Sequence, residues 1–268
     1  MERGTFVGRE YIDALKTHYP HFVVGAAQEK VDDKLHIGIV DDWCRNYDEV
    51  GVDTLARYQS IRQRPWGAAR GVWESAGGGP NRRMAGAYGS YKGLINLKPA
   101  TDLVLYSNLI WELRPKTILE FGSLQGGSAL WFADQLDALC GGQGEVHSFE
   151  LCYKCIHPRA SHPRLRFHEA DMRDLSTLKR EFLESLPRPW LVIDDCHENL
   201  ENVVPFMASL MQEGDYFVIE DAFSNPTPEI IGKATEAIDG LGFLVDTKYT
   251  DAYGMNVTCA PNGWLVKI

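Results

Sequence analysis

Two short acidic stretches carry the residue types from which a metal site is built. The run Asp194–His197, DDCH, and the pair Glu220-Asp221 each follow an apolar run, and one predicted helix separates them. Neighbouring parallel strands end at the same edge of a sheet, so we expect both stretches there. Carboxylates in that position would repel one another, and a hard cation such as Mg²⁺ with oxygen ligands removes the repulsion. Alternatively, these acids cap the following helices and bind no metal.

His197 lies three residues after Asp194. A histidine beside a metal-activated hydroxyl suits the role of general base near neutral pH. The same residue could be a zinc ligand or a hydrogen-bonded core histidine. A zinc site calls for more His or Cys at ligand spacing, so the residues favour magnesium.

A glycine-rich segment, Glu120–Ser128 (EFGSLQGGS), follows another apolar run and opens a predicted helix. Glycines let the backbone turn tightly and approach a ligand at the free N–H groups of a helix start. A phosphate site is disfavoured, because the segment lacks both the P-loop lysine and the GxGxxG spacing. The Glu120 carboxylate would repel a pyrophosphate but suits a cationic amino-acid group. A simple strand-to-helix turn is the alternative.

Two further acids follow predicted strands. Glu150 ends the second strand, a position that accepts hydrogen bonds from ribose hydroxyls in nucleoside-binding sheets. Asp171 follows the third strand. Either residue could instead be a solvated strand-end carboxylate. The polar loop 249–258 is either a substrate rim or an ordered turn.

The order of elements explains why these residues gather. Apolar strands alternate with helices of 10–15 residues, which predicts βαβ units and an α/β fold with a largely parallel sheet. The predicted strands are 116–121, 145–149, 164–168, 190–193, 216–219, 243–246 and 264–268. The predicted helices are 102–113, 127–140, 174–186, 200–211 and 229–240.

The N-terminal part is patterned more weakly. Residues 8–18 and 41–62 have helical spacing, and the glycine-rich stretch 75–90 predicts a long loop, either a mobile lid or a surface linker. We therefore expect a mainly helical N-terminal extension over residues 1–84 and one larger domain over residues 85–268.

Composition narrows the partners. The chain of 268 residues has 27 Lys and Arg against 37 Asp and Glu, a formal charge of −10. Such an acidic protein is a poor candidate for binding nucleic acid or an anionic membrane. No apolar run approaches the ~20 residues that span a bilayer, and the N-terminus lacks a signal-peptide core. The six cysteines are too sparse for a disulfide scaffold. We expect a cytoplasmic protein that takes a small-molecule substrate.

These motifs together resemble a known family. The segment ILEFGSLQGGSALWFA is similar to motif I of class I S-adenosylmethionine (SAM)-dependent methyltransferases. Its form, with VIDDCHENLENV, EGDYFVIED and the ending YTDAYGMNVTCAPNGWLVKI, resembles the cephalosporin hydroxylase/rhamnosyl O-methyltransferase family and magnesium-dependent macrolide-sugar O-methyltransferases. The resemblance covers about residues 85–268 and implies a Rossmann-like methyltransferase fold with a mostly parallel seven-stranded sheet.

The resemblance also implies roles for individual residues. His197 would be the general base. Asp194, Glu220 and Asp221 would ligate Mg²⁺. The resemblance assigns no role to Asp195. Residues that would bind SAM are Glu120, Gly122, Ser123, Gly126, Ser128, Glu150, Asp171 and Asp194.

The implied reaction is transfer of the SAM methyl group to a hydroxyl of a small natural product, such as a sugar, vicinal diol or catechol, in secondary metabolism. We also expect a homo-oligomer. Two alternatives stay open: an N- or C-methyltransferase, and a non-catalytic SAM-fold subunit of an oxygenase. The combined presence of His197 and the acids argues against a non-catalytic subunit.

Overall fold

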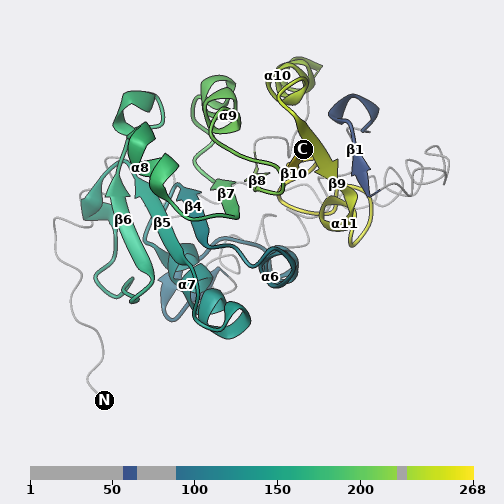
Figure 1. Ribbon diagram of the computed structural model, residues 1–268. Helices are drawn as coiled ribbons and strands as arrows, with labels where there is room; N and C mark the ends of the chain where they lie inside the picture. The colour runs from purple at the N-terminus through teal and green to yellow at the C-terminus, as the bar shows by residue number, and fades with distance from the viewer. Residues whose placement is uncertain (1–56, 65–88, 222–227) are drawn as a thin grey trace, which may run out of the picture.

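The computed structural model describes residues 57–64, 89–221 and 228–268 (Figure 1). Within these ranges one sheet has the strand order β1-β9-β10-β8-β7-β4-β5-β6. Its strands are β1 (Tyr58–Gln59), β4 (Thr117–Phe121), β5 (Glu145–Glu150), β6 (Leu165–Glu169), β7 (Trp190–Asp194), β8 (Tyr216–Ile219), β9 (Phe243–Asp246) and β10 (Trp264–Lys267). A separate hairpin joins β2 (Ser90–Tyr91) to β3 (Leu94–Ile95).

Strand direction matches the expected α/β fold. The pairs β4–β5, β4–β7, β5–β6 and β7–β8 are parallel, and β10 runs antiparallel to both β8 and β9. The seven strands expected from the sequence are all present. The structure adds an eighth, β1, which pairs antiparallel with β9.

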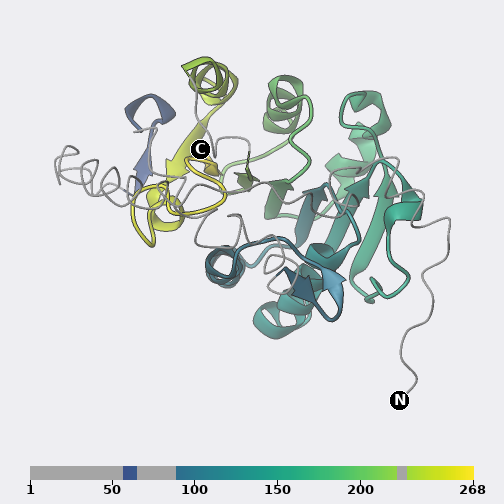
Figure 2. The same ribbon diagram turned by 180° about the vertical axis from the view of Figure 1, so that it is seen from behind.

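Helices cover both faces of the sheet (Figures 1 and 2). One layer holds α6 (Ala100–Leu113), α7 (Gly127–Cys140) and α11 (Thr247–Thr250), and the other holds α8 (Arg180–Ser185), α9 (Leu200–Ala208) and α10 (Pro228–Ile238). Successive strand residues point to opposite faces. In β4, Ile118 therefore packs in the core beneath α6 and α7, whereas Leu119 packs beneath α8 and α9.

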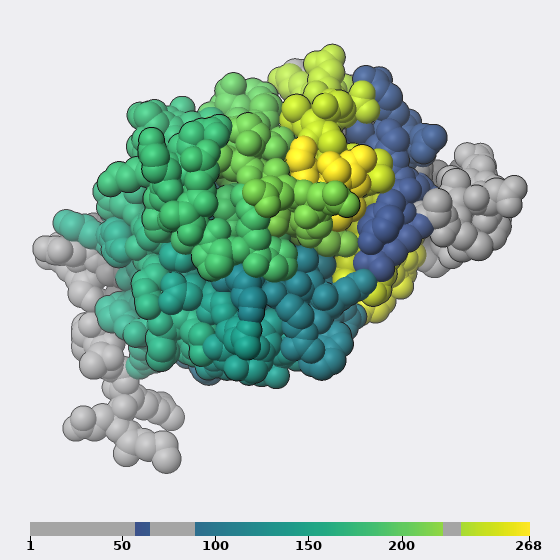
Figure 3. Space-filling view, viewed as in Figure 1, coloured from purple at the N-terminus to yellow at the C-terminus, as the bar shows by residue number. Residues whose placement is uncertain are grey.

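The segment 57–64 belongs to this body although it precedes the expected domain start. Figure 3 shows it, in blue, against the yellow C-terminal elements. Arg57 forms ion pairs with Asp246 of β9 at 3.0 Å and with Glu112 of α6 at 2.9 Å. The folded unit therefore includes residues from the predicted N-terminal extension.

Two helix predictions are wrong in the described ranges. Residues 57–62, predicted as the end of a helix, form β1 and the start of a 3₁₀ turn, Ile61–Gln63, because β9 offers a free edge for pairing. The predicted helix 174–186 is interrupted: Asp174 caps a 3₁₀ turn, Leu175–Thr177, and α8 starts only at Arg180. The predicted helix 8–18, residues 41–56 and most of the loop 75–90 lie outside the described residues. Nowhere in the described ranges is a helix long and apolar enough to cross a membrane.

Candidate active site

The carboxyl ends of four parallel strands are held together by backbone hydrogen bonds beyond the strands themselves. The N–H of Gly122 donates to the carbonyl of Phe149 at 2.9 Å, joining the ends of β4 and β5. The N–H of Asp195 donates to Phe121 at 2.9 Å, joining β7 to β4. The N–H of Glu220 donates to the backbone carbonyl of Asp194 at 2.9 Å, joining β8 to β7. The loops that carry the predicted site residues are thus fixed relative to one another.

The glycine-rich turn requires glycine at two predicted cofactor positions. Gly122 has φ +98°, and a Cβ there would lie 2.9 Å from the backbone of Asp195. Gly126 has φ +85° and caps α7, and a Cβ there would lie 2.7 Å from the Phe167 ring. Side chains at these positions would therefore push the turn away from β7 and β6.

Glu120 is fully buried at the end of β4. Its Oε2 accepts a hydrogen bond from the Ser148 hydroxyl at 2.5 Å, and Ser148 in turn bonds the Ser123 hydroxyl. Its Oε1 has no hydrogen-bond partner in the described part of the chain. Burial raises the pKa of Glu120, and the nearby Lys98 ammonium opposes that rise. An acceptor of this kind beside the turn fits the amino group of SAM, while Ser128 is buried in the first turn of α7.

Glu150 links the glycine-rich turn to the loop after β5. One carboxylate oxygen accepts the N–H of Leu124 at 2.7 Å, and the other accepts that of Leu151 at 2.9 Å. Asp171 instead lies at the surface, where Arg173 pairs with it at 2.9 Å and lowers its pKa. Contacts of Glu150 with ribose and of Asp171 with adenine stay predictions.

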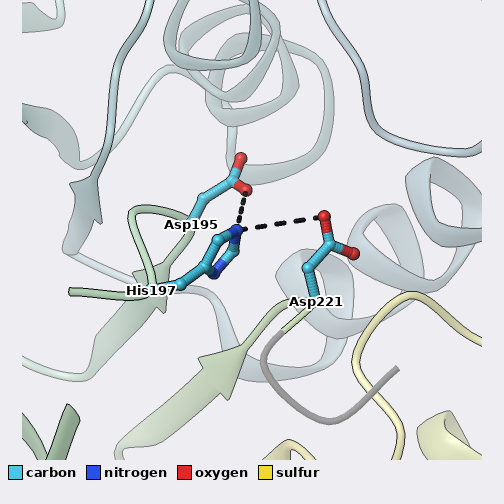
Figure 4. Close-up of side chains that lie close together, drawn as sticks. All are labelled: Asp195, His197 and Asp221. Carbon is cyan, nitrogen blue, oxygen red and sulfur yellow. Dashed lines mark ion pairs between the residues drawn. The ribbon is translucent and has the colours of Figure 1, made fainter. Parts of the chain in front are cut away.

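The two acidic stretches meet, as their positions after β7 and β8 predict. Asp195, His197 and Asp221 offer ligand atoms that all lie within 4.8 Å of one another (Figure 4). The Nε2 atom of His197 lies 3.8 Å from an Asp195 oxygen and 3.9 Å from an Asp221 oxygen. We call these three residues the acid–histidine cluster.

Asp194 lies beneath this cluster and is fully buried. Its Oδ1 accepts the backbone N–H of His197 at 3.0 Å, which holds His197 at φ +59°. Its Oδ2 has no hydrogen-bond partner among the described residues. Burial raises the pKa of Asp194 to about 7. Desolvation lowers the pKa of His197, which favours the neutral form of its imidazole.

Glu220, predicted as a metal ligand, has its oxygens engaged by protein donors. Lys98 donates to Oε1 at 2.8 Å and to Oε2 at 2.9 Å, and the Tyr106 hydroxyl also donates to Oε1. Lys98 lies just before α6, and Tyr106 lies in the middle of that helix. Of the three predicted ligands, the structure brings only Asp221 into the acid–histidine cluster and adds Asp195, so ligation by Asp194 and Glu220 stays a prediction.

Sequence reasoning missed Lys98, Tyr106 and the part played by Asp195. Lys98 precedes Pro99 at the start of α6, where a lysine ordinarily faces solvent. No local pattern signals that it is buried against residues 97 and 122 positions further along the chain. For the loop 249–258, the structure favours an ordered turn over a substrate rim. The buried side chains of Thr250 and Asn256 hydrogen-bond each other, and both accept the backbone N–H of Asn262.

The residues present fit both Mg²⁺ and SAM, the two groups that the family resemblance implies. Two carboxylates and an imidazole within 4.8 Å suit a divalent cation. The buried Asp194 oxygen that has no hydrogen-bond partner in the described ranges adds acceptor capacity nearby. The Glu120 oxygen beside the glycine-rich turn, which no described residue hydrogen-bonds, fits a cationic amino-acid group.

Comparisons with known proteins agree with this geometry. The family model for rhamnosyl O-methyltransferase/CmcI matches residues 87–268. A rhamnosyl O-methyltransferase of Mycobacterium tuberculosis (strain ATCC 25618 / H37Rv) is 28% identical over 197 residues, covering 66% of this chain and 78% of that protein.

Two solved structures extend the likeness to three dimensions. A structure of CmcI-D160 with magnesium and SAM is 29% identical, with a TM-score of 0.58, over 68% of this chain and 77% of that chain. CmcI-N160 with S-adenosylhomocysteine (SAH) is 26% identical, with a TM-score of 0.56, over 67% of this chain and 82% of that chain. This chain therefore belongs to the rhamnosyl O-methyltransferase/CmcI family of class I SAM-dependent O-methyltransferases.

Proposed function

We propose that this enzyme uses a divalent cation, Mg²⁺, to methylate a hydroxyl of a small natural product that presents two neighbouring oxygens, such as a sugar, a vicinal diol or a catechol. The acid–histidine cluster carries this proposal, because it lies at the same sheet edge as the glycine-rich turn. The CmcI relative solved with magnesium and SAM supports it. A role in secondary metabolism follows from the same resemblance.

The oxygen preference of Mg²⁺ assigns roles within the cluster. The Asp195 and Asp221 carboxylates would hold the cation, whereas the His197 imidazole is a poorer partner for a hard ion. When bound, the cation supplies a Lewis acid that orients and acidifies a substrate hydroxyl, and SAM supplies the methyl group.

His197 then acts as the proton acceptor at Nε2. Its backbone N–H is fixed by Asp194, and its ring faces the two cluster carboxylates, so the neutral imidazole is directed at the same point as they are. A developing imidazolium is stabilised by those carboxylates, whose oxygens lie 3.8 and 3.9 Å away. Glu120 and the glycine-rich turn contribute by holding SAM in a fixed orientation, the proximity effect on which methyl transfer chiefly relies.

The first experiment is calorimetric titration with SAH, in Mg²⁺ and again in EDTA, followed by catechol or a sugar diol as the second ligand. We expect SAH to bind in both buffers and the diol to bind only with metal. Absence of SAH binding in either buffer would contradict a SAM-dependent enzyme. If EDTA left diol binding unchanged, the proposed binding of the diol through a divalent cation would be contradicted.

A matched pair of histidine variants tests the base. His197→Gln should keep SAH affinity and metal affinity within about threefold of the wild type and lower turnover by about 10²–10⁴. The control is His162→Gln, because His162 pairs with Asp137 near the amino end of β6, at the opposite sheet edge, and should leave turnover unchanged. Loss of metal affinity in His197→Gln would make this histidine a ligand instead.

A further inference from the structure

Lys98 is a buried lysine whose ammonium is fully engaged by acids of the site. Its side chain is 1% exposed. Nζ donates to Asp195 Oδ2 at 2.9 Å and to the two Glu220 oxygens at 2.8 and 2.9 Å. An ammonium has three N–H donors, so these contacts account for its hydrogen-bonding capacity.

The surroundings fix this cation in place. The Tyr106 and Phe132 rings lie 5.6 and 5.7 Å from Nζ, within the range of cation–π attraction. Tyr106 also donates to Glu220, so the same helix positions the cation and its acid. That helix is anchored at its start, where Asp102 accepts the N–H of Cys259 at 2.8 Å. These contacts hold the Lys98 ammonium in one position between Asp195 and Glu220.

Asp195 belongs both to this ion pair and to the acid–histidine cluster. Lys98 binds the Asp195 oxygen Oδ2, whereas Oδ1 is the oxygen 3.8 Å from His197 Nε2, so one carboxylate shares its negative charge between the ammonium and the cluster. A fixed positive charge this close also repels a divalent cation, since charges in partly buried surroundings interact through a low effective dielectric. Conversely, the five acids of the site would repel one another without a compensating cation; they are Glu120, Asp194, Asp195, Glu220 and Asp221.

We propose that Lys98 is a built-in counter-ion that competes with the divalent cation for Asp195. It keeps the acids together in the metal-free protein and weakens metal binding, so that the cation exchanges instead of remaining permanently bound. The identity of that cation as a cofactor of methyl transfer rests on the proposed function, but the competition itself does not.

The test measures metal affinity directly. Lys98→Met removes the charge and keeps an apolar chain between Tyr106 and Phe132. Calorimetry with Mg²⁺ and electron paramagnetic resonance titration with Mn²⁺ should show binding at least about tenfold tighter than in the wild type. Lys98→Arg keeps the charge and should stay within about threefold. The control Lys92→Met removes an exposed lysine of the neighbouring hairpin, paired with Asp134, and should leave affinity unchanged.

Equal or weaker metal binding by Lys98→Met overturns the proposal, as does the absence of binding in that variant. If Lys98→Met unfolds without metal, the proposal expects millimolar Mg²⁺, but not NaCl of equal ionic strength, to restore its circular dichroism; a variant that stays unfolded in Mg²⁺ also overturns it. SAH binding and methyl transfer by the wild type are measured separately. Their failure would remove the methyltransferase proposal while tighter metal binding by Lys98→Met still stood.

Discussion

Replacing Arg64 with methionine should strongly destabilise the protein, although this residue lies within the predicted N-terminal extension. Arg64 is 3% exposed and is the last described residue of the segment that carries β1. It donates to Asn262 at 2.7 Å, to Gln59 at 3.1 Å and to Asp251 at 2.6 Å. It therefore ties β1 to the loop that precedes β10.

The size of the effect follows from the burial of these partners. Asn262 and Gln59 are 0% and 6% exposed, so water cannot replace the lost donor. A hydrogen bond from a charged group contributes roughly 1.5–3 kcal/mol. The Asp251 side chain is 26% exposed and regains part of its hydration, so its bond counts for less. Methionine keeps the apolar contacts of the stem, and we expect a loss of about 3–5 kcal/mol in the free energy of unfolding.

Urea unfolding, followed by circular dichroism, measures this loss. The matched control is Arg62→Met, because Arg62 is in the same segment and pairs with Asp239 at 2.7 Å while 63% exposed. An exposed pair contributes less than about 1 kcal/mol. If Arg64→Met fell within about 0.5 kcal/mol of Arg62→Met, the conclusion that residues 57–64 are an integral part of the folded body would be refuted.

Two remaining predictions concern packing and pH. Gly127→Ala should lower the free energy of unfolding by about 1–3 kcal/mol, because its Cβ would lie 1.9 Å from the Ile95 carbonyl; Gly232→Ala, with open space around it in α10, should raise it by about 0.5–1 kcal/mol. Urea unfolding measures both changes. Equal effects of the two substitutions would contradict the close approach of β3, which carries Ile95, to the start of α7. Burial raises the pKa of Asp194 from 3.8 to about 7, so the folded protein retains a proton that the unfolded chain releases. In EDTA its stability should therefore fall through Asp194 as the pH rises from about 4 to about 7. The stability gained by Asp194→Asn over the wild type should grow between pH 5 and pH 8, and a gain independent of pH would count against this ionisation.

The sheet and the site edge could be predicted because their signals are local. The apolar runs of β4, β5, β7 and β8 end at acids or at the glycine-rich turn, and parallel strands bring those ends to one edge. Gly122 and Gly126 were recognisable as turn residues for the same reason. The prediction that the two acidic stretches meet needed no knowledge of distant contacts, and the structure confirms it.

Which of the adjacent acids Asp194 and Asp195 enters the cluster was not evident from the sequence, and the resemblance pointed to Asp194. Successive residues of a strand face opposite sides of the sheet, so only one of the two side chains can enter the cluster. The ladder includes Asp194, whose carboxylate is buried, and Asp195 after it meets His197 and Asp221 while also pairing with Lys98.

The α/β order, the strand ends and the residue types available there follow from the amino-acid sequence alone, since hydrophobic periodicity and turn residues act over a few positions. The burial of Lys98 against Glu220, 122 positions away, and the extension of the sheet by β1 through β9 become visible only in the folded chain. Pairing of a charge or a strand edge depends on which segments the completed fold brings into contact, and no spacing within either segment records that.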